Sequence, residues 1–86
     1  MDWPDWWEWE LDLNLDHLRE QMIRRQFSET DLREMLERAT GFREEEEFGR
    51  WVILTTKDEH PWHVIVEPQM SEQLLLVITA YRDEPI

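Results

Sequence analysis

His17 and Arg25 are the two residues of the first predicted helix whose side chains could do chemistry together. They are eight residues apart, and at about 100° of rotation per residue they share a broad side of the helix, two turns apart. An imidazole transfers protons near neutral pH, and a guanidinium binds phosphate oxygens. The pair is a candidate for phosphate binding or acid–base chemistry. The alternative is a histidine at the helix start near a carboxylate, with an arginine that covers the second helix.

Tyr81 and Arg82 stand at the end of the last predicted strand. A phenol hydroxyl and a guanidinium in that place could position a reacting group. A tyrosine at the end of a core strand can equally be structural. Both interpretations of Tyr81 stay open at this point.

His60 and His63 have a His-x-x-His spacing. In a helix this spacing would place both rings on one side, where they could bind one metal ion. A proline separates them at a predicted junction of turn and strand, so their rings are not aligned, and no third ligand is obvious. No Gly-rich phosphate loop or nucleophile elbow is present to support a small-molecule enzyme. We expect neither a metal site nor a cofactor.

Seven of the nine basic residues lie between residues 17 and 50, and all seven are arginines. They could form a positive stripe across two helices. The i, i+4 spacing of Glu29 with Arg33 and of Glu34 with Arg38 instead favours ion pairs within a helix. We predict the ion pairs.

The composition excludes several classes of protein. Among 86 residues, 21 are acidic and 9 basic, the net charge is −12, and there is no cysteine for a disulfide framework or a thiol nucleophile. No apolar run approaches the roughly 20 residues of a membrane span, and the acidic start is not a signal peptide. We expect one cytoplasmic domain over residues 1–86 with no membrane contact. The net charge makes nucleic acid a doubtful partner, because it repels a phosphate backbone.

Apolar and polar residues alternate from Trp7 to Leu15, which predicts a half-buried strand. The spacing then changes to that of an amphipathic helix over about residues 15–26, with Asn14 or Asp16 as its N-cap. Like charges on the outer face of the strand discourage pairing with another chain. These acidic residues are Glu8, Glu10 and Asp12.

Ser28 and Asp31 resemble a capping box at the start of a second amphipathic helix over about residues 29–39. Gly41 follows where a left-handed C-cap would need glycine. The Glu-rich segment 42–48 is then either a strand with an exposed edge or a solvated loop.

Three further strands are predicted over residues 51–56, 62–67 and 74–81, with connections short enough for antiparallel neighbours. The order β-α-α-β-β-β indicates an α+β fold, with a mainly antiparallel sheet and both helices packed on one face.

The strand over residues 74–81 is apolar on both sides, and strict alternation places Val77 and Tyr81 on one side and Ile78 and Ala80 on the other. Two helices cover one face only. The acidic, Trp-rich extension 1–6, with Trp3 and Trp6, or a second copy of the chain would cover the other. We expect a homodimer, because a small domain buries little surface alone. Residues 83–86 form an acidic tail.

Three sequence motifs resemble a widespread, uncharacterised bacterial domain. Its first helix reads His-Ala-x-x-Arg-Met-x-x-Arg-Gly-Ile-Ser, a Gly-Arg and a strand follow its second helix, and its last strand ends Val-Ile-Thr-Val-Tyr. Residues 17–28, Gly49-Arg50-Trp51-Val52 and residues 77–81 correspond to these, so the resemblance covers roughly residues 15–82. The domain is similar to RelE- and BrnT-type toxins, which are small ribonucleases, and the resemblance implies a sheet with two N-terminal helices. By position, His17, Arg25 and Tyr81 match the pattern, and Arg82 adjoins the place where such toxins carry catalytic groups.

Two positions depart from that pattern: Gln21 stands where it has Arg, and Gln26 where it has Gly. A ribonuclease needs cations to hold phosphate and to stabilise its transition state. These departures and the net charge favour a non-catalytic protein-interaction module that forms a homodimer and binds an antitoxin-like protein. The alternative is an RNA-directed endoribonuclease of a toxin–antitoxin system, in which Arg25 binds phosphate, His17 moves the proton, and Tyr81 with Arg82 positions the scissile group. That alternative requires arginines that converge without carboxylate partners.

Overall fold

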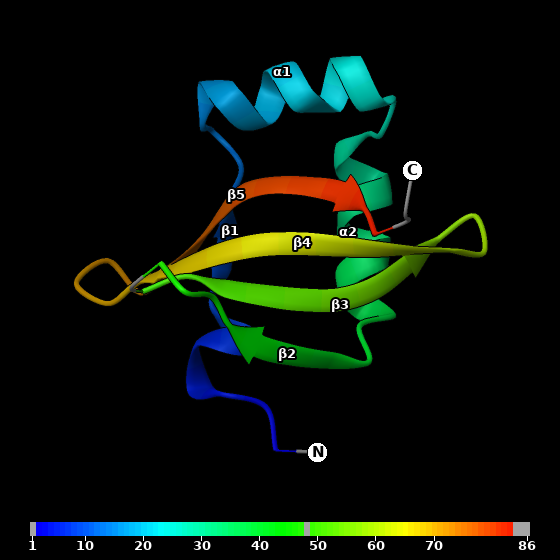
Figure 1. Cartoon of the computed structure of the whole chain (residues 1–86). Coiled ribbons are helices and arrows are strands. Elements are labelled where there is room, and N and C mark those ends of the chain that lie inside the picture. The colour runs from blue at the N-terminus through cyan, green and yellow to red at the C-terminus, as the bar shows by residue number, and fades with distance from the viewer. Residues whose placement is uncertain (1, 48, 84–86) are drawn as a thin grey trace.

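A computed structural model of the chain describes residues 2–47 and 49–83. The chain forms two α-helices and five strands, which confirms the α+β class and the β-α-α-β-β-β order, with a short 3₁₀ helix added in front (Figure 1). The elements are η1 (Asp5–Glu8), β1 (Glu10–Asp12), α1 (Asp16–Arg25), α2 (Glu29–Glu37), β2 (Gly41–Glu44), β3 (Trp51–Lys57), β4 (His60–Gln69) and β5 (Leu74–Arg82).

The five strands form one sheet in the order β1-β5-β4-β3-β2. Strands β2, β3 and β4 each pair antiparallel with the next strand along the chain. By contrast, β1 pairs parallel with β5, over Leu74–Leu76 only. The later half of β5 therefore has a strand on one side alone, and α1 runs along its other edge (Figure 1).

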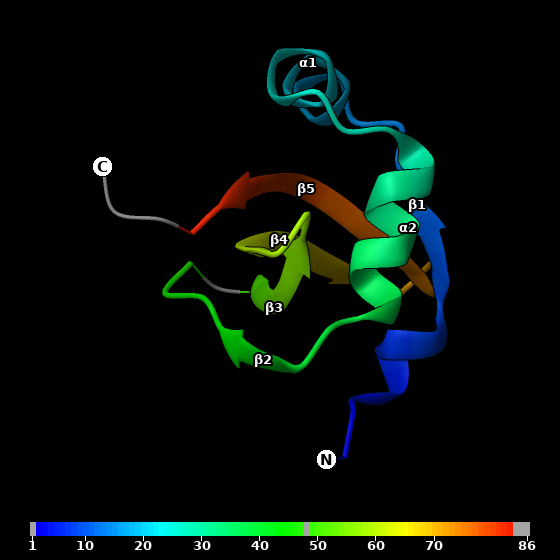
Figure 2. The same cartoon turned by 90° about the vertical axis from the view of Figure 1, so that its right-hand side faces the viewer.

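Both helices pack on one face of the sheet, as predicted: α2 crosses β3, β4 and β5, and α1 lies over β5 (Figures 1 and 2). Leu18 of α1 and Leu32 and Met35 of α2 are fully buried there against Val64 and Val77 of the sheet. The i, i+3 spacing of Leu32 and Met35 puts both on the stripe of α2 that faces the sheet.

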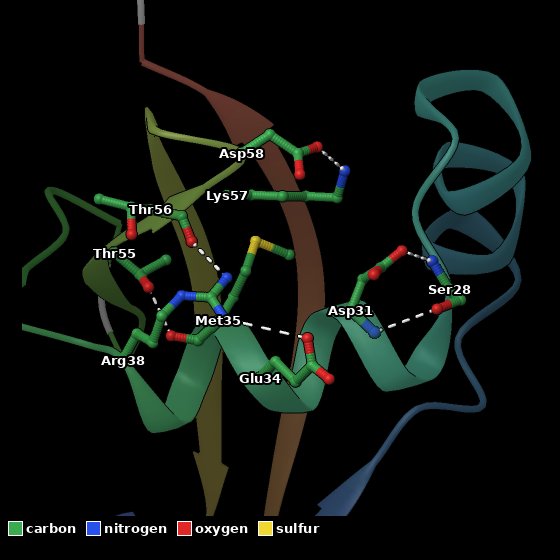
Figure 3. A network of polar contacts seen from close by, with 9 residues as sticks. All are labelled: Ser28, Asp31, Glu34, Met35, Arg38, Thr55, Thr56, Lys57 and Asp58. Atoms are coloured by element: carbon green, nitrogen blue, oxygen red, sulfur yellow. Dashed lines mark hydrogen bonds and ion pairs between the residues drawn. The ribbon is translucent and has the colours of Figure 1, made fainter.

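Polar contacts tie the end of α2 to β3 (Figure 3). The buried Thr55 hydroxyl donates to the carbonyl oxygen of Met35. Arg38 Nη2 donates to the carbonyl oxygen of Thr56 at 2.9 Å. Because these bonds satisfy a carbonyl in the last turn of α2 and the end of β3, they fix where the helix ends on the sheet.

The strand predicted from Trp7 to Leu15 is wrong at both ends. Trp7 lies in η1, and only Glu10–Asp12 is strand. Tryptophan packing explains the difference: Trp7 stacks on Trp3 at 4.3 Å between ring centroids, and Trp6 packs at 5.5 Å from Trp51. The extension thus joins the core on the helix side, where Trp6 is buried, and does not cover the opposite face.

The helix boundaries agree with those predicted from the spacing of apolar residues. The capping residues agree with the prediction only in part. Ser28 and Asp31 form the predicted capping box at α2 (Figure 3). Leu15, rather than Asn14 or Asp16, is the N-cap of α1, without a side-chain cap bond. Gly41 is not a C-cap, because the C-cap of α2 is Arg38, with a φ of −88°, and Gly41 begins β2.

A β-bulge in β5 changes which side chains lie on which face. Ile65 pairs with Thr79 and Val66 with Val77, so Ile78 is an extra residue in the ladder. After it the alternation is reversed. Ala80 lies with Val77 in the helix-side core, whereas strict alternation predicted opposite sides for them. Tyr81 consequently lies on the face opposite Val77.

The face opposite the helices has its own small cluster, made of the buried Val52, Ile65 and Ile78. Half of the Glu-rich segment is strand, since β2 ends at Glu44. The loop that follows bends toward this face, where it lines a cavity of about 400 Å³. Its walls include Glu45, Glu46, Glu47, Arg50, Ile65, Ile78, Thr79 and Tyr81.

Candidate functional site

Three side chains form a hydrogen-bonded chain where β4 and β5 run side by side. Tyr81 Oη lies 3.4 Å from His63 Nδ1, and His63 Nε2 lies 3.0 Å from Asp83 Oδ2. His63 and Tyr81 are direct cross-strand partners, and their rings meet edge to face at 5.5 Å. The His63 side chain is only 11% exposed, whereas that of Asp83 is 57% exposed. These hydrogen bonds thus connect a half-buried phenol to a carboxylate that is exposed to water.

The backbone holds Asp83 in this position. Its amide donates to the carbonyl oxygen of Pro61 at 2.8 Å, which continues the β4–β5 ladder one residue beyond the end of β5. The Asp83 carboxylate therefore faces His63 because the two strands stay paired to this point, although Asp83 itself is exposed.

Burial raises the pKa of Tyr81 above its ordinary value of 10.0, and the charges of Glu45 and Asp83 raise it further. Arg43 and Arg25 partly oppose these effects. The phenol is therefore protonated at neutral pH and can donate to His63 Nδ1. The network then assigns the remaining imidazole proton to Nε2, which donates to Asp83.

Arg25 reaches the same strand end from the last turn of α1. Its Nη1 donates to the carbonyl oxygen of Ala80 at 2.7 Å and lies 3.3 Å from Thr79 Oγ1. Within the described residues, no carboxylate lies within 4 Å of this guanidinium. Arg25 thus keeps donors that Ala80 and Thr79 do not use, because a guanidinium carries five.

A pocket of about 340 Å³, open to solvent, lies at this strand end, lined by Arg25, Trp62, Tyr81 and Arg82. Three of the four predicted site residues therefore converge: Arg25, Tyr81 and Arg82. His17 is not among them. It lies exposed at the opposite end of α1, about 12 Å from Arg25 along the helix axis at 1.5 Å per residue.

No local pattern marks His63 as a site residue, because its spacing from His60 suggests metal binding instead. In β4 an odd spacing puts the two histidines on opposite sides of the strand. Within the described residues, no three or more His, Asp and Glu side chains are grouped so that they could hold a metal ion. The signal that could have found His63 is its pairing with Tyr81, but that pairing depends on the bulge.

Several of the other arginines form ion pairs away from this pocket. The two predicted pairs within α2 and its C-cap are present, Arg33–Glu29 at 3.1 Å and Arg38–Glu34 at 3.9 Å. Arg50 lies 2.9 Å from Glu47 and 3.3 Å from Glu67. Within the described part of the chain, three of the seven arginines between residues 17 and 50 are thus paired with carboxylates, and the two predicted i, i+4 pairs are confirmed.

Gln21 and Gln26 occupy structurally demanding positions. Gln26 caps α1 with φ 56° and ψ 55°, the left-handed conformation that favours glycine. Gln21 is buried at 5% exposure, and its Oε1 has no hydrogen-bond partner among the described residues. Neither residue contributes to the pocket at the end of β5.

An antiparallel sheet with two helices on one face, and a Tyr-His-Asp chain beside an arginine, defines a small α+β domain with a site at one strand end. Residues 15–82 match the family described as a domain of unknown function (DUF4258), so the chain belongs to that family. Neither the curated proteins nor the solved structures include a match to this chain. Within the described residues, no helix has the length and apolar character needed to span a bilayer.

Proposed function

We propose that the domain binds and cleaves RNA at the strand-end pocket, without a metal ion. The observation that carries this proposal is the guanidinium of Arg25, which no carboxylate of residues 2–47 and 49–83 approaches within 4 Å. It lies in one pocket with Tyr81, which is hydrogen-bonded to the His63–Asp83 pair. A guanidinium in this position supports the ribonuclease alternative, because such an enzyme needs cations to hold phosphate. The same proposal includes a relationship of this domain to RelE- and BrnT-type toxins.

The chemistry follows from the direction of the hydrogen bonds. A ribose 2′ hydroxyl attacks the adjacent phosphorus while Tyr81 Oη takes its proton and passes its own to His63 Nδ1. Asp83 stabilises the imidazolium that forms. The P–O5′ bond breaks, the leaving oxygen takes a proton from water, and a 2′,3′-cyclic phosphate remains. The hydroxide left by that water takes the extra proton from the His63 imidazolium, which restores the starting state. Arg25 stabilises the charge on the phosphoryl oxygens. In this arrangement His63 moves the proton in place of the predicted His17.

Part of the net charge of −12 lies far from the pocket, whereas Glu45 and Asp83 lie near Tyr81 and oppose RNA binding there. The acids of β1 lie beside the first residues of β5, since Asp12 pairs with Leu76. Tyr81 is five residues further along, about 16 Å at 3.3 Å per residue. That distance is about twice the Debye length of about 8 Å at physiological salt, so these charges are largely screened from the pocket.

The test is a salt titration of RNA binding, followed by a cleavage assay in the presence of a chelator. Wild type is compared with Arg25→Ala, and Arg24→Ala is the matched control, since it removes the same charge from the neighbouring position of α1. We expect binding that weakens steeply with salt and is lost only in Arg25→Ala. We expect cleavage to be lost in His63→Gln as well. Absence of binding at low salt contradicts the proposal.

A second candidate function is the protein-interaction module that forms a homodimer. The observation that favours it is the face opposite the helices, where Leu54 and Leu76 are half-exposed beside the buried Val52 and Ile65. A second copy packed on that face would bury both leucines. Sedimentation equilibrium tests this candidate: a concentration-dependent dimer that Leu54→Asp abolishes supports it, and a monomer at high concentration contradicts it.

A further inference from the structure

A groove on the helix side of the sheet lies at the far end of β5 from the proposed RNA site. It has a volume of about 250 Å³ and is lined mainly by apolar side chains of η1, β1 and α2 and by the residue between η1 and β1. Trp7, Trp9 and Leu11 form one side, and Leu36 of α2 forms the other. For scale, an engineered apolar cavity of about 150 Å³ holds a benzene ring. The groove therefore has room for an apolar side chain from outside.

The groove adjoins an open strand edge. β1 is the terminal strand of the sheet and pairs only with β5, on one side. Figure 2 shows no other described element beyond β1 on its outer side. Backbone groups on such an edge can pair with an added strand. Leu11 points into the groove, so its neighbours Glu10 and Asp12 point to the other face of the sheet.

The charge around this edge is mainly negative. Residues 1–16 contain six acidic residues and no lysine or arginine. Glu8 and Glu10 are exposed. Two charged residues of α2 line the groove, Glu37 and Arg33, and Arg33 is paired with Glu29 at 3.1 Å. Like charges opposite one another disfavour pairing of β1 with a second copy of this acidic chain. The same charges attract a strand that carries lysine or arginine.

We propose that β1 and its groove bind an extended, basic segment of another protein. Apolar and basic residues alternate in that segment, so that one apolar side chain enters the groove beside Trp9 and Leu11 while the basic side chains lie beside Glu10 and Asp12. The apolar contact supplies affinity, and the acids select the partner by charge. This inference does not depend on the proposed RNA site.

The experiment measures the binding of three fluorescein-labelled peptides to the wild-type protein by fluorescence anisotropy. One peptide alternates lysine and valine, one alternates lysine and serine, and one alternates glutamate and valine. We expect the Lys/Val peptide to bind, the Lys/Ser peptide to bind about tenfold more weakly because it has no apolar residue for the groove, and the Glu/Val peptide not to bind.

Two double variants then locate the site. Glu8→Lys with Glu10→Lys reverses exposed charges at the edge, and Glu20→Lys with Glu59→Lys makes the same charge change on α1 and at the β3–β4 turn. All four residues are exposed, so the fold is preserved. We expect only the first variant to weaken Lys/Val binding by about tenfold or more. The inference is overturned if the Lys/Ser peptide binds as tightly as Lys/Val, if both variants weaken binding equally, or if the Lys/Val peptide does not bind at low salt.

Discussion

Arg25 and Ala80 are 55 residues apart in sequence, and the guanidinium of the first donates to the carbonyl oxygen of the second at 2.7 Å. Ala80 lies on the part of β5 that β1 does not reach, so this bond occupies an acceptor on an otherwise unpaired strand edge. One side chain thus joins the end of α1 to the strand that carries Tyr81. The same guanidinium lines the pocket in which we place the phosphate.

Arg25→Ala is expected to lower the free energy of unfolding by about 1 kcal/mol, since it removes a part-buried hydrogen bond from a charged donor. Arg24→Ala is expected to change it by no more than about 0.5 kcal/mol, because among the described residues no hydrogen bond or ion pair involves its side chain. Urea denaturation of both variants measures the difference. Equal stability of the two would show that the bond to Ala80 does not hold α1 on the sheet.

Gln26→Gly is expected to stabilise the fold by about 1 kcal/mol, because a left-handed φ of 56° costs about that much for a residue with a Cβ. Glu20→Gly, in the middle of the same helix, is expected to destabilise by a similar amount. Thermal unfolding of both variants checks the prediction. A loss of stability in Gln26→Gly would mean that the Gln26 side chain makes a contribution larger than its backbone strain.

Tyr81 is the single tyrosine of the chain, so its titration can be followed by the ultraviolet absorbance of tyrosinate. Its pKa is raised by burial, so we expect a midpoint above 10.0 in the folded protein that falls toward 10.0 in urea. The folded state binds this proton more tightly than the unfolded state. Its contribution to stability is therefore complete below pH 10 and is lost as the pH rises through the folded value.

Tyr81→Phe is the control for this titration. The variant is expected to lose less stability than wild type between pH 9 and pH 11, because it has no phenol proton to release. A folded-state midpoint at or below 10.0 would contradict the burial of the Tyr81 phenol.

Asp31 accepts a hydrogen bond from the backbone amide of Ser28 at 2.9 Å, and this bond is the main cause of its lowered pKa (Figure 3). Asp31→Asn and Ser28→Ala are each expected to destabilise the protein by about 1 kcal/mol at pH 7. A lowered carboxyl pKa contributes stability above the unfolded value of 3.8, and that contribution is lost as the pH falls through the folded value. The difference between wild type and Asp31→Asn in thermal unfolding should therefore shrink between pH 5 and pH 3. A difference that does not change over this range would mean that the Asp31 charge has no part in the cap.

Local features of the sequence predicted the helices well. The spacing of Leu32, Met35 and Leu36 marks the buried stripe of α2, and the Ser28–Asp31 pair marks its start. Both patterns act over three or four residues, within one turn of helix, so neighbours in the chain are sufficient to determine them. The N-terminal segment alternates just as regularly, yet Trp7 is not in a strand, because Trp3 and Trp6 pack against β2 and β3. Contacts between distant aromatic rings there outweigh the local pattern.

The sequence by itself determined the α+β class, the two amphipathic helices with the cap of α2, and the placement of Arg25 and Tyr81 at element ends. The tertiary structure alone decided that His63 rather than His17 joins them. The reason is the extra residue Ile78, which reverses the alternation in β5 and turns Tyr81 from the side of Val77 to the side of His63. A bulge is set by how two strands pair across the sheet, and no period within one strand reports it.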